Sequence, residues 1–385
     1  MIYLDNNATT QVDKRVLKKM LPFFTERFNN PHSQVTKYNA DIIKKIDSAR
    51  EYLANLIGAK KEEIIFTSGA TESNNLAIKG LMNKVKRGKN HFLTLNTEHK
   101  CVLEAMRRME IKGAKVTILN VNKKGLIDIE QFLKSITDST VLVSIMFANN
   151  ETGVIQPIEK IGKICKDKNI LFHTDAAQAV GKIEIDVKKM NIDMMSISGH
   201  KFYGPKGIGA LYMREKPRIR LETLIDGGGQ EMNIRSGTLP VPLCIGIGEA
   251  AKIAKKEIKK DSANCLYLRN YLIEKIKKKF NKIHINGCMK NRLSSNLNFS
   301  LGGINSIDLI NNLDYTVISA GSACTSAEIE SSYVLSGMGL KKSMVESSIR
   351  IGISKFNTRK DIDKAIDDIY KTVMRLKNKS AKNNS

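Results

Sequence analysis

Residues 196–209 read S-I-S-G-H-K-F-Y-G-P-K-G-I-G, with an apolar segment before them and a glycine-rich segment at their end. This pattern predicts a buried strand over 194–198 that opens into a loop. Lys201 lies in that loop between apolar and glycine-rich neighbours, where a lysine can lose its proton and form a Schiff base with a carbonyl cofactor. Ser198 and His200 could hold an anion beside it. A surface lysine in a loop is the alternative that these residues alone leave open.

Short apolar segments and helical segments alternate through the region that contains this loop. This alternation predicts a mostly parallel seven-stranded sheet with helices on both faces, in an α/β domain. Ligands of such sheets bind at the loops beyond the carboxyl ends of the strands. The expected strands are 64–67, 91–95, 115–119, 141–147, 170–174, 194–198 and 210–212, and the expected helices are 14–24, 36–57, 72–87, 99–112, 128–136 and 158–168.

The pattern changes after about residue 240 and predicts a smaller α+β domain. A helical stretch covers 246–280 with an interruption near Asp261, and a strand covers 297–300. Thr358 and Asp361 form the sequence pattern of a capping box before a last helix. We expect a large domain over 16–256, a small domain formed by 1–15 with 257–376, and a basic flexible tail over 377–385.

The composition is that of a water-soluble globular protein with a basic surface. The 385 residues include 63 Lys and Arg against 39 Asp and Glu, which gives a net charge of +24. A basic nucleic-acid-binding or scaffold protein is therefore an alternative. The lysines are spread along helical segments, and no RNA-binding or zinc-finger pattern occurs, so we expect no nucleic-acid partner.

The chain also lacks the patterns of a membrane or secreted protein. No apolar run reaches the roughly 18 residues that span a membrane, and the N-terminus has no signal-peptide pattern. We therefore expect a cytoplasmic protein without a membrane partner. No C-x-x-C pair occurs, which argues against a zinc site and a disulfide framework; the cysteines are Cys101, Cys165, Cys244, Cys265, Cys288 and Cys324.

Three further loops follow predicted strands. Residues 67–75, T-S-G-A-T-E-S-N-N, could form an anion cradle at a helix start, although such turns are also common for structural reasons alone. His99, in T-E-H-K, could stack on a planar ligand or serve only as a cap. Asp175 ends an apolar strand, where a carboxylate needs a cationic partner: the protonated nitrogen of a pyridine ring, or a nearby arginine.

Together these loops predict a site for pyridoxal phosphate. The chain resembles the cysteine desulfurases of the NifS/IscS type from Tyr3 to about Leu376. These are fold-type I pyridoxal-phosphate-dependent transferases of the class V aminotransferase group. The motifs that carry the resemblance are T-S-G-A-T-E-S-N-N, T-E-H-K, N-N-E-T-G, D-A-A-Q, S-G-H-K-x-Y-G-P-K-G, R-S-G-T and A-G-S-A-C.

The resemblance implies a role for each matching residue. Lys201 would carry the cofactor as a Schiff base, Asp175 would pair with its ring nitrogen, and Gln178 would contact its ring hydroxyl. His99 would stack on the ring and transfer protons. Thr238 would reach the phosphate of the partner subunit, which implies a homodimer. The implied phosphate ligands are Ala70, Thr71, Ser198 and His200, and the implied ligands of the substrate carboxylate are Asn150 and Arg350.

Cys324 matches the family's sulfur-accepting nucleophile, and its Gly/Ser-rich surroundings favour the accessibility that a thiolate needs. The resemblance implies a cysteine desulfurase that converts L-cysteine to L-alanine and leaves a persulfide on Cys324. The acceptor would be an iron–sulfur scaffold or a tRNA-thiolation protein. No metal is expected in the resting enzyme, although Cys324 could transiently ligate an iron–sulfur cluster on a scaffold.

Two departures from the family pattern limit what is carried over. The family's N-P-S-S-x-H is N-P-H-S-Q-V here, over 30–35, so the usual histidine is displaced. The chain also stops soon after the last helix, so scaffold docking through a longer C-terminus is not implied. The alternatives within the same fold are a selenocysteine lyase and an aminotransferase, and an aminotransferase would not need Cys324.

Overall fold

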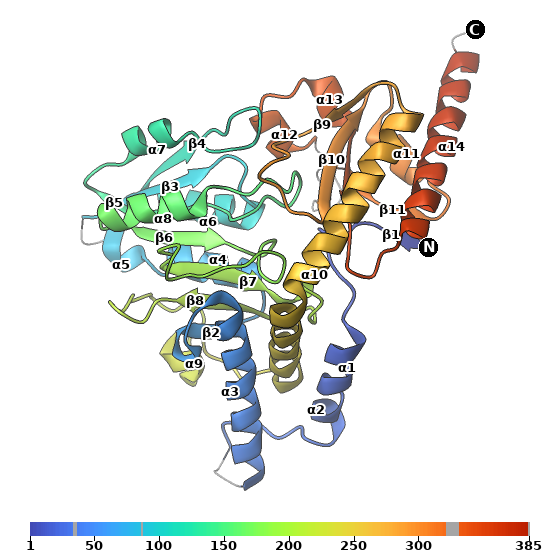
Figure 1. The fold of residues 1–385 in the computed structure, drawn as a ribbon. Coiled ribbons are helices and arrows are strands. Elements are labelled where there is room, and N and C mark those ends of the chain that lie inside the picture. Colours follow the sequence, from blue (N-terminus) through green and yellow to red (C-terminus); the bar gives the residue numbers. More distant parts are fainter. Residues whose placement is uncertain (34–36, 86–87, 321–330, 384–385) are drawn as a thin grey trace.

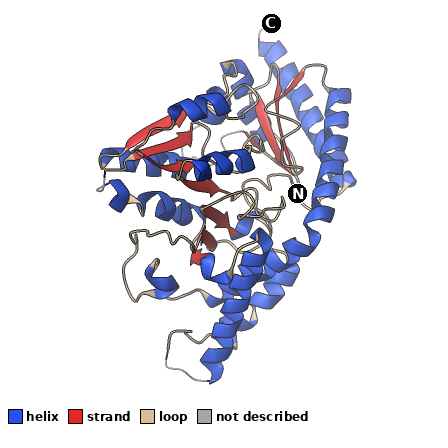
Figure 2. Ribbon diagram, turned by 60° about the vertical axis from the view of Figure 1, so that its left-hand side comes forward, coloured by secondary structure: helices blue, strands red, loops and turns tan. Residues whose placement is uncertain are grey.

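The computed structural model describes residues 1–33, 37–85, 88–320 and 331–383. A seven-stranded sheet with helices on both faces forms the larger part of the chain (Figure 1). The long helix α10 (Val241–Lys279) leads from this part to a smaller sheet beside the C-terminal helix (Figures 1 and 2).

The seven-stranded sheet has the order β2-β8-β7-β6-β5-β3-β4. Only β8 runs in the direction opposite to the other strands of this sheet, so the predicted mostly parallel sheet is confirmed. Apart from the edge strand β4 and the first residue of β6, every residue of these strands is buried, which explains the nearly continuous apolar runs of the sequence. The strands are β2 (Ile64–Thr67), β3 (His91–Leu95), β4 (Lys115–Leu119), β5 (Thr140–Ser144), β6 (Leu171–Asp175), β7 (Met194–Ser198) and β8 (Gly209–Met213).

Each face of this sheet packs into its own hydrophobic core. Phe66 and Ile65 are adjacent on β2, yet they belong to different core clusters, because successive side chains point to opposite faces. Burying each such side chain contributes about 1.5–3 kcal/mol. The helices around the sheet are α3 (Lys37–Ile57), α4 (Ala70–Lys79), α5 (Met82–Val85), α6 (Lys100–Ile111), α7 (Ile129–Ser135) and α8 (Ile158–Asp167).

The smaller sheet has the order β12-β13-β10-β9 and is antiparallel. A separate two-stranded pairing joins β1 to β11 in parallel. The strands are β1 (Ile2–Tyr3), β9 (Ile283–Ile285), β10 (Asn296–Leu301), β11 (Thr316–Val317), β12 (Ser319–Ala320) and β13 (Ser348–Gly352). The remaining helical elements are α1 (Lys14–Met20), α2 (Pro22–Thr25), η1 (Lys61–Glu63), η2 (Gly199–Lys201), α9 (Gln230–Asn233), α11 (Ser306–Asn311), α12 (Tyr333–Gly337), α13 (Lys342–Glu346) and α14 (Arg359–Asn383).

A third hydrophobic cluster packs the first residues of the chain against its C-terminal part. Ile2 and Leu4 join it with side chains of α10, β10, β13 and α14. This packing supports grouping 1–15 with 257–376, and the domain boundaries stay a prediction. The predicted capping box is confirmed, since Thr358 Oγ1 accepts from the Asp361 N–H at 3.3 Å and the Asp361 carboxylate accepts from the Thr358 N–H at 2.8 Å.

Four helix predictions were wrong in detail. Helix α10 is continuous, because Asp261 points its carboxylate toward Lys355 at 3.8 Å and does not break the helix. The expected helix over 14–24 divides at Pro22, which starts α2. The expected helix over 72–87 divides at Gly80, where a Cβ would lie 2.5 Å from the Leu76 carbonyl oxygen. Helix α14 continues to Asn383, where a loose tail was expected.

Candidate active site

The register of three neighbouring strands brings two of the predicted loops together. Thr67 of β2 pairs with Gly209 of β8, and Gly209 pairs with Ser198 of β7. A Cβ on Gly209 would lie 2.6 Å from Gly69 Cα, a distance that only glycine allows. The turn that starts α4 therefore lies beside the end of β7, immediately before Lys201.

Lys201 is half-buried in η2, and its amino group contacts the N-terminal segment. Its Nζ donates to the carbonyl oxygens of Asn7, at 2.7 Å, and Ala8, at 2.6 Å. The hydroxyl of Thr9 lies 2.9 Å from His200 Nδ1, which fixes the same segment beside η2. These contacts orient the one amine that the sequence singled out as a nucleophile.

Asp175 is buried at the carboxyl end of β6, with 6% of its surface exposed. Its carboxylate accepts from Asn74 Nδ2 at 2.7 Å and from the Ala177 N–H at 2.9 Å. Within the described residues it forms no ion pair, so the arginine partner considered from sequence does not occur there. A buried carboxylate without a cation is costly, and a cationic ligand atom would relieve that cost.

His99 is the N-cap of α6. It is linked to Asp175 by contacts through Cys101 and Asn74. Its Nδ1 accepts from the Cys101 N–H at 3.3 Å, so the neutral ring carries its proton on Nε2. Burial lowers the pKa of His99, the charge of Asp175 raises it, and the charge of Lys201 lowers it. Asn74 Nδ2 contacts both Cys101 Sγ, at 3.2 Å, and Asp175.

Gln178 is buried, and its amide is held from both ends. Its Nε2 donates to the Asn7 carbonyl oxygen at 2.8 Å. Its Oε1 accepts from Asn7 Nδ2 at 3.3 Å and from Lys182 Nζ at 3.0 Å. Since the Asn7 carbonyl also accepts from Lys201, Gln178 and Lys201 belong to one hydrogen-bonded network.

The predicted anion ligands surround the start of α4. Ser198 is buried, His200 and Ala70 are half-buried, and Thr71 is exposed. The first N–H groups of a helix are available to an anion. Burial, followed by the charges of nearby lysines, lowers the pKa of His200 to about 4, so its ring is neutral at neutral pH.

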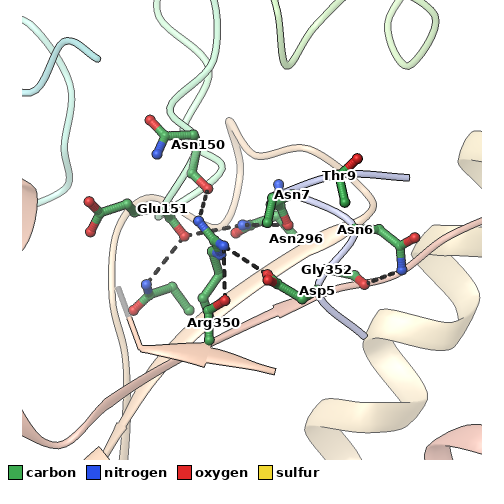
Figure 3. Close-up of polar contacts among 12 residues, drawn as sticks. Asp5, Asn6, Asn7, Thr9, Asn150, Glu151, Asn296, Arg350 and Gly352 are labelled. Carbon is green, nitrogen blue, oxygen red and sulfur yellow. Dashed lines mark hydrogen bonds and ion pairs between the residues drawn. The ribbon is translucent and has the colours of Figure 1, made fainter. Parts of the chain in front are cut away.

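Arg350 is almost fully buried on β13 and faces the same N-terminal segment (Figure 3). It donates to the Asp5 carboxylate at 2.7 Å, to Ser319 Oγ at 3.1 Å and to the Asn150 carbonyl oxygen at 3.2 Å. Among the described residues, Arg350 Nε and Asn150 Oδ1 are buried without a hydrogen-bond partner. These unpaired groups leave capacity for a small polar ligand.

Glu151 follows Asn150 and is fully buried. Its carboxylate accepts from the Ser332 hydroxyl at 2.5 Å. Burial raises the pKa of Glu151 to about 7, despite the opposing hydrogen bond from Ser332 and the charges of Arg350 and Lys100. The N-N-E-T-G motif therefore contributes an ionisable group that titrates near neutral pH.

Two further predicted residues are Thr238 and Cys324. Thr238 is exposed in the single chain. Cys324 lies outside the described residues. No group of three or more His, Cys, Asp or Glu side chains able to hold a metal ion is found in the described ranges. The same part of the chain contains no helix with the length and apolar character needed to cross a membrane.

The described residues fit pyridoxal phosphate. The buried Asp175 carboxylate suits a protonated ring nitrogen, Lys201 presents an amine, and the start of α4 suits a phosphate. Sequence reasoning missed Asn7 and Asn74, which link these groups by hydrogen bonds. Asn74 lies inside the motif T-S-G-A-T-E-S-N-N, but the contacts of Asn7 and Asn74 cross 171 and 101 residues of sequence, and local patterns do not reveal such contacts.

Comparisons with known proteins show the family to which the chain belongs. Residues 2–365 match the Aminotransferase class-V family. The cysteine desulfurase IscS of Rickettsia africae is 49% identical over 376 residues, which cover 98% of this chain and 92% of that protein. A structure named NifS-like protein is 36% identical with a TM-score of 0.90, and covers 97% of this chain and 99% of its own. The structure of SspA in complex with cysteine is 39% identical with a TM-score of 0.83. The match covers 93% of this chain and 100% of the SspA chain. The chain therefore belongs to the class V aminotransferase family, among its pyridoxal-phosphate-dependent cysteine desulfurases.

Proposed function

We propose that the chain takes sulfur from L-cysteine, releases L-alanine and carries the sulfur as a persulfide on Cys324. The observation that supports this most is the N-terminal segment 5–8. Its Asn7 and Ala8 carbonyls hold the Lys201 amine, and its Asp5 carboxylate holds the Arg350 guanidinium. One short segment therefore contacts both the amine that would bind the cofactor and the guanidinium that would bind an amino-acid carboxylate.

Different residues of the cluster would bind different parts of the cofactor. Lys201 would hold it covalently, Asp175 would pair with the ring nitrogen, and Gln178 would contact the ring hydroxyl. His99 would stack on the ring and move protons through Nε2. The phosphate would lie at the start of α4, against Ala70, Thr71, Ser198 and His200. When bound, pyridoxal phosphate withdraws electrons from the Cα of an attached amino acid.

Arg350 and Asn150 would bind the carboxylate of L-cysteine. The Arg350 Nε is buried without a partner among the described residues, and a guanidinium suits bidentate binding of a carboxylate. Lys201, once free of the cofactor, would take the Cα proton. Its amine already lies against carbonyl oxygens that keep it in place.

The sulfur step would belong to Cys324. Its thiolate attacks the substrate sulfur, the S–S bond of a persulfide forms, and the Cβ–S bond breaks with its electron pair left on carbon. Protonation of Cβ by His99 or Lys201, and return of a proton to Cα from Lys201, would give L-alanine. The persulfide would then pass to an iron–sulfur scaffold or a tRNA-thiolation protein in the cytoplasm.

The active form would be a homodimer in which Thr238 reaches the cofactor phosphate of the partner subunit. Thr238 is exposed and precedes α10, so it is available to a second chain. Exposed apolar side chains on and near α1, α2 and α9 support such an interface. They include Leu21, Phe24, Phe28 and Met232.

Incubation with L-cysteine and a thiol reductant tests the proposal when alanine and sulfide are quantified together. Equal yields of alanine and sulfide are expected from the unaltered enzyme, and neither from Cys324→Ser. Cys288→Ser, at a half-buried cysteine, is the matched control and should keep the activity. Pyruvate and ammonia in place of alanine would indicate a thiol-eliminating lyase, and transamination that survives Cys324→Ser would indicate an aminotransferase.

A further inference from the structure

We propose that Lys182 is a positioning residue for the cofactor: it fixes the Gln178 amide and places a positive charge beside Lys201. The inference rests on the proposed function, in that it takes Lys201 as the residue that holds pyridoxal phosphate. Lys182 matches none of the roles assigned above. It lies four residues after Gln178, in the loop between β6 and β7.

Lys182 is half-buried, and its amino group has no negative partner among the described residues. Its hydrogen bond goes to the neutral Gln178 Oε1 at 3.0 Å. Within the described ranges it forms no ion pair with a carboxylate. Lysines are rarely buried unless paired, because desolvation of an ammonium is costly. Burial, with the nearby charge of Lys201, lowers the pKa of Lys182 to about 7.

The ionisable groups that face Lys182 come from three elements. Lys201 and His200 lie on η2, Arg350 on β13 and Cys265 on α10. Burial raises the pKa of Cys265 to about 12, so its thiol is neutral, and the lowered pKa of His200 leaves its ring neutral as well. The charged groups that face the Lys182 amino group, Lys201 and Arg350, are therefore both positive. Such a position suits the anionic oxygen atoms of a bound ligand.

The hydrogen bonds of Gln178 show how Lys182 would act through it. With Lys182 donating to Oε1, the Gln178 amide keeps its Nε2 toward the Asn7 carbonyl, which also accepts from Lys201. Loss of the ammonium would leave the Gln178 amide held by Asn7 alone. It would also remove one positive charge near Lys201, and a nearby positive charge lowers the proton affinity of an amine or imine nitrogen.

The test is a pH titration of the absorbance of the bound cofactor, which reports the protonation of the nitrogen that Lys201 shares with it. Lys182→Met should raise the midpoint by about one pH unit, and Lys182→Arg should leave it near that of the unaltered protein. Lys182→Gln removes the charge but keeps a hydrogen-bond donor, and should show the same upward shift as Lys182→Met. Lys189→Met, at an exposed lysine of the same loop, is the control.

The proposal is overturned if Lys182→Met and Lys182→Gln have the same titration midpoint as the unaltered protein. If Lys182→Met does not fold, the midpoint of Lys182→Gln alone decides. An unchanged midpoint would leave the proposed function intact, because the cofactor would still be bound at Lys201. The absence of any Lys201-linked absorbance in the unaltered protein would overturn both. Circular dichroism of each variant shows that the fold is retained.

Discussion

The Arg350 guanidinium donates to the Asp5 carboxylate at 2.7 Å, although the two residues lie 345 positions apart in the chain (Figure 3). The N-terminal segment thus contacts β13, the strand that carries the proposed substrate ligand Arg350. The same segment contacts Lys201 through Asn7 and Ala8. The first residues of the chain therefore contact both Lys201, the proposed cofactor lysine, and Arg350, the proposed substrate ligand.

Arg350→Lys should lower kcat/KM for L-cysteine with less change in cofactor content. A lysine keeps the charge, but it loses the planar fork that binds a carboxylate bidentately. The loss of about 1.5–3 kcal/mol corresponds to a decrease of roughly 10- to 150-fold. Steady-state alanine production measures it. Arg359→Lys, at an exposed residue of α14, is the control, and an unchanged kcat/KM in Arg350→Lys would remove Arg350 from the substrate site.

Asp175→Asn should decrease kcat by about 10- to 150-fold, the cost of one hydrogen bond to a charged group. The amide oxygen can still accept from the Ala177 N–H, and the amide NH2 can donate to Asn74 Oδ1 if the Asn74 amide turns over. The substitution removes the negative charge that would hold a proton on the ring nitrogen. Turnover per bound cofactor is the measurement. Asp128→Asn, at the N-cap of α7, should behave as the unaltered enzyme, because Asn also caps helices well. Equal turnover for Asp175→Asn would contradict the assigned role.

The raised pKa of Glu151, about 7 in the folded chain, predicts how its removal changes stability with pH. The folded state keeps a proton that the unfolded state loses above its ordinary pKa, so this residue lowers stability as pH rises from about 4.5 to 7. Glu151→Gln should therefore raise the free energy of unfolding by up to about 3 kcal/mol at pH 8 and by little at pH 5. Urea unfolding at fixed protein and cofactor concentrations measures this difference.

Exposed Glu159→Gln is the control for that experiment, and its effect should be small at both pH values. The Ser332 hydroxyl can donate to a glutamine oxygen as it does to the carboxylate, so the hydrogen bond is retained. A Glu151→Gln effect of the same size at pH 5 and pH 8 would mean that Glu151 does not titrate between these values.

Mixing two inactive variants tests whether Thr238 serves the partner's site. Each of Lys201→Ala and Thr238→Ala should impair activity alone. In a mixed dimer, one site would combine an intact Lys201 with an intact Thr238 from the other subunit. Equimolar mixing after subunit exchange should therefore restore about a quarter of the sites. Activity no higher than the mean of the two separate variants would contradict a site shared between subunits.

The strand positions and the parallel sheet could be predicted because buried strands leave continuous apolar runs, as in 194–198. The breaks at Pro22 and Gly80 could have been predicted from proline and glycine alone. The continuity of α10 past Asp261 could not, because the Lys355 ammonium that faces this carboxylate comes from a distant part of the chain.

Site residues could be predicted where the side chain itself indicates a chemical role, as with the amine of Lys201, the carboxylate of Asp175 and the guanidinium of Arg350. They could not be predicted where a residue acts by position. Asn7, Asn74 and Lys182 are common residue types, and their importance comes from contacts that only the folded chain brings together. Glu151 is similar, since its pKa depends on complete burial and not on its neighbours in sequence.

The most direct test of the account is borohydride reduction of the purified protein loaded with pyridoxal phosphate, followed by peptide mapping. The account predicts that the reduced cofactor is attached to Lys201 alone, and that Lys201→Ala carries none. A reduced adduct on another lysine, or no adduct on the unaltered protein, would contradict it.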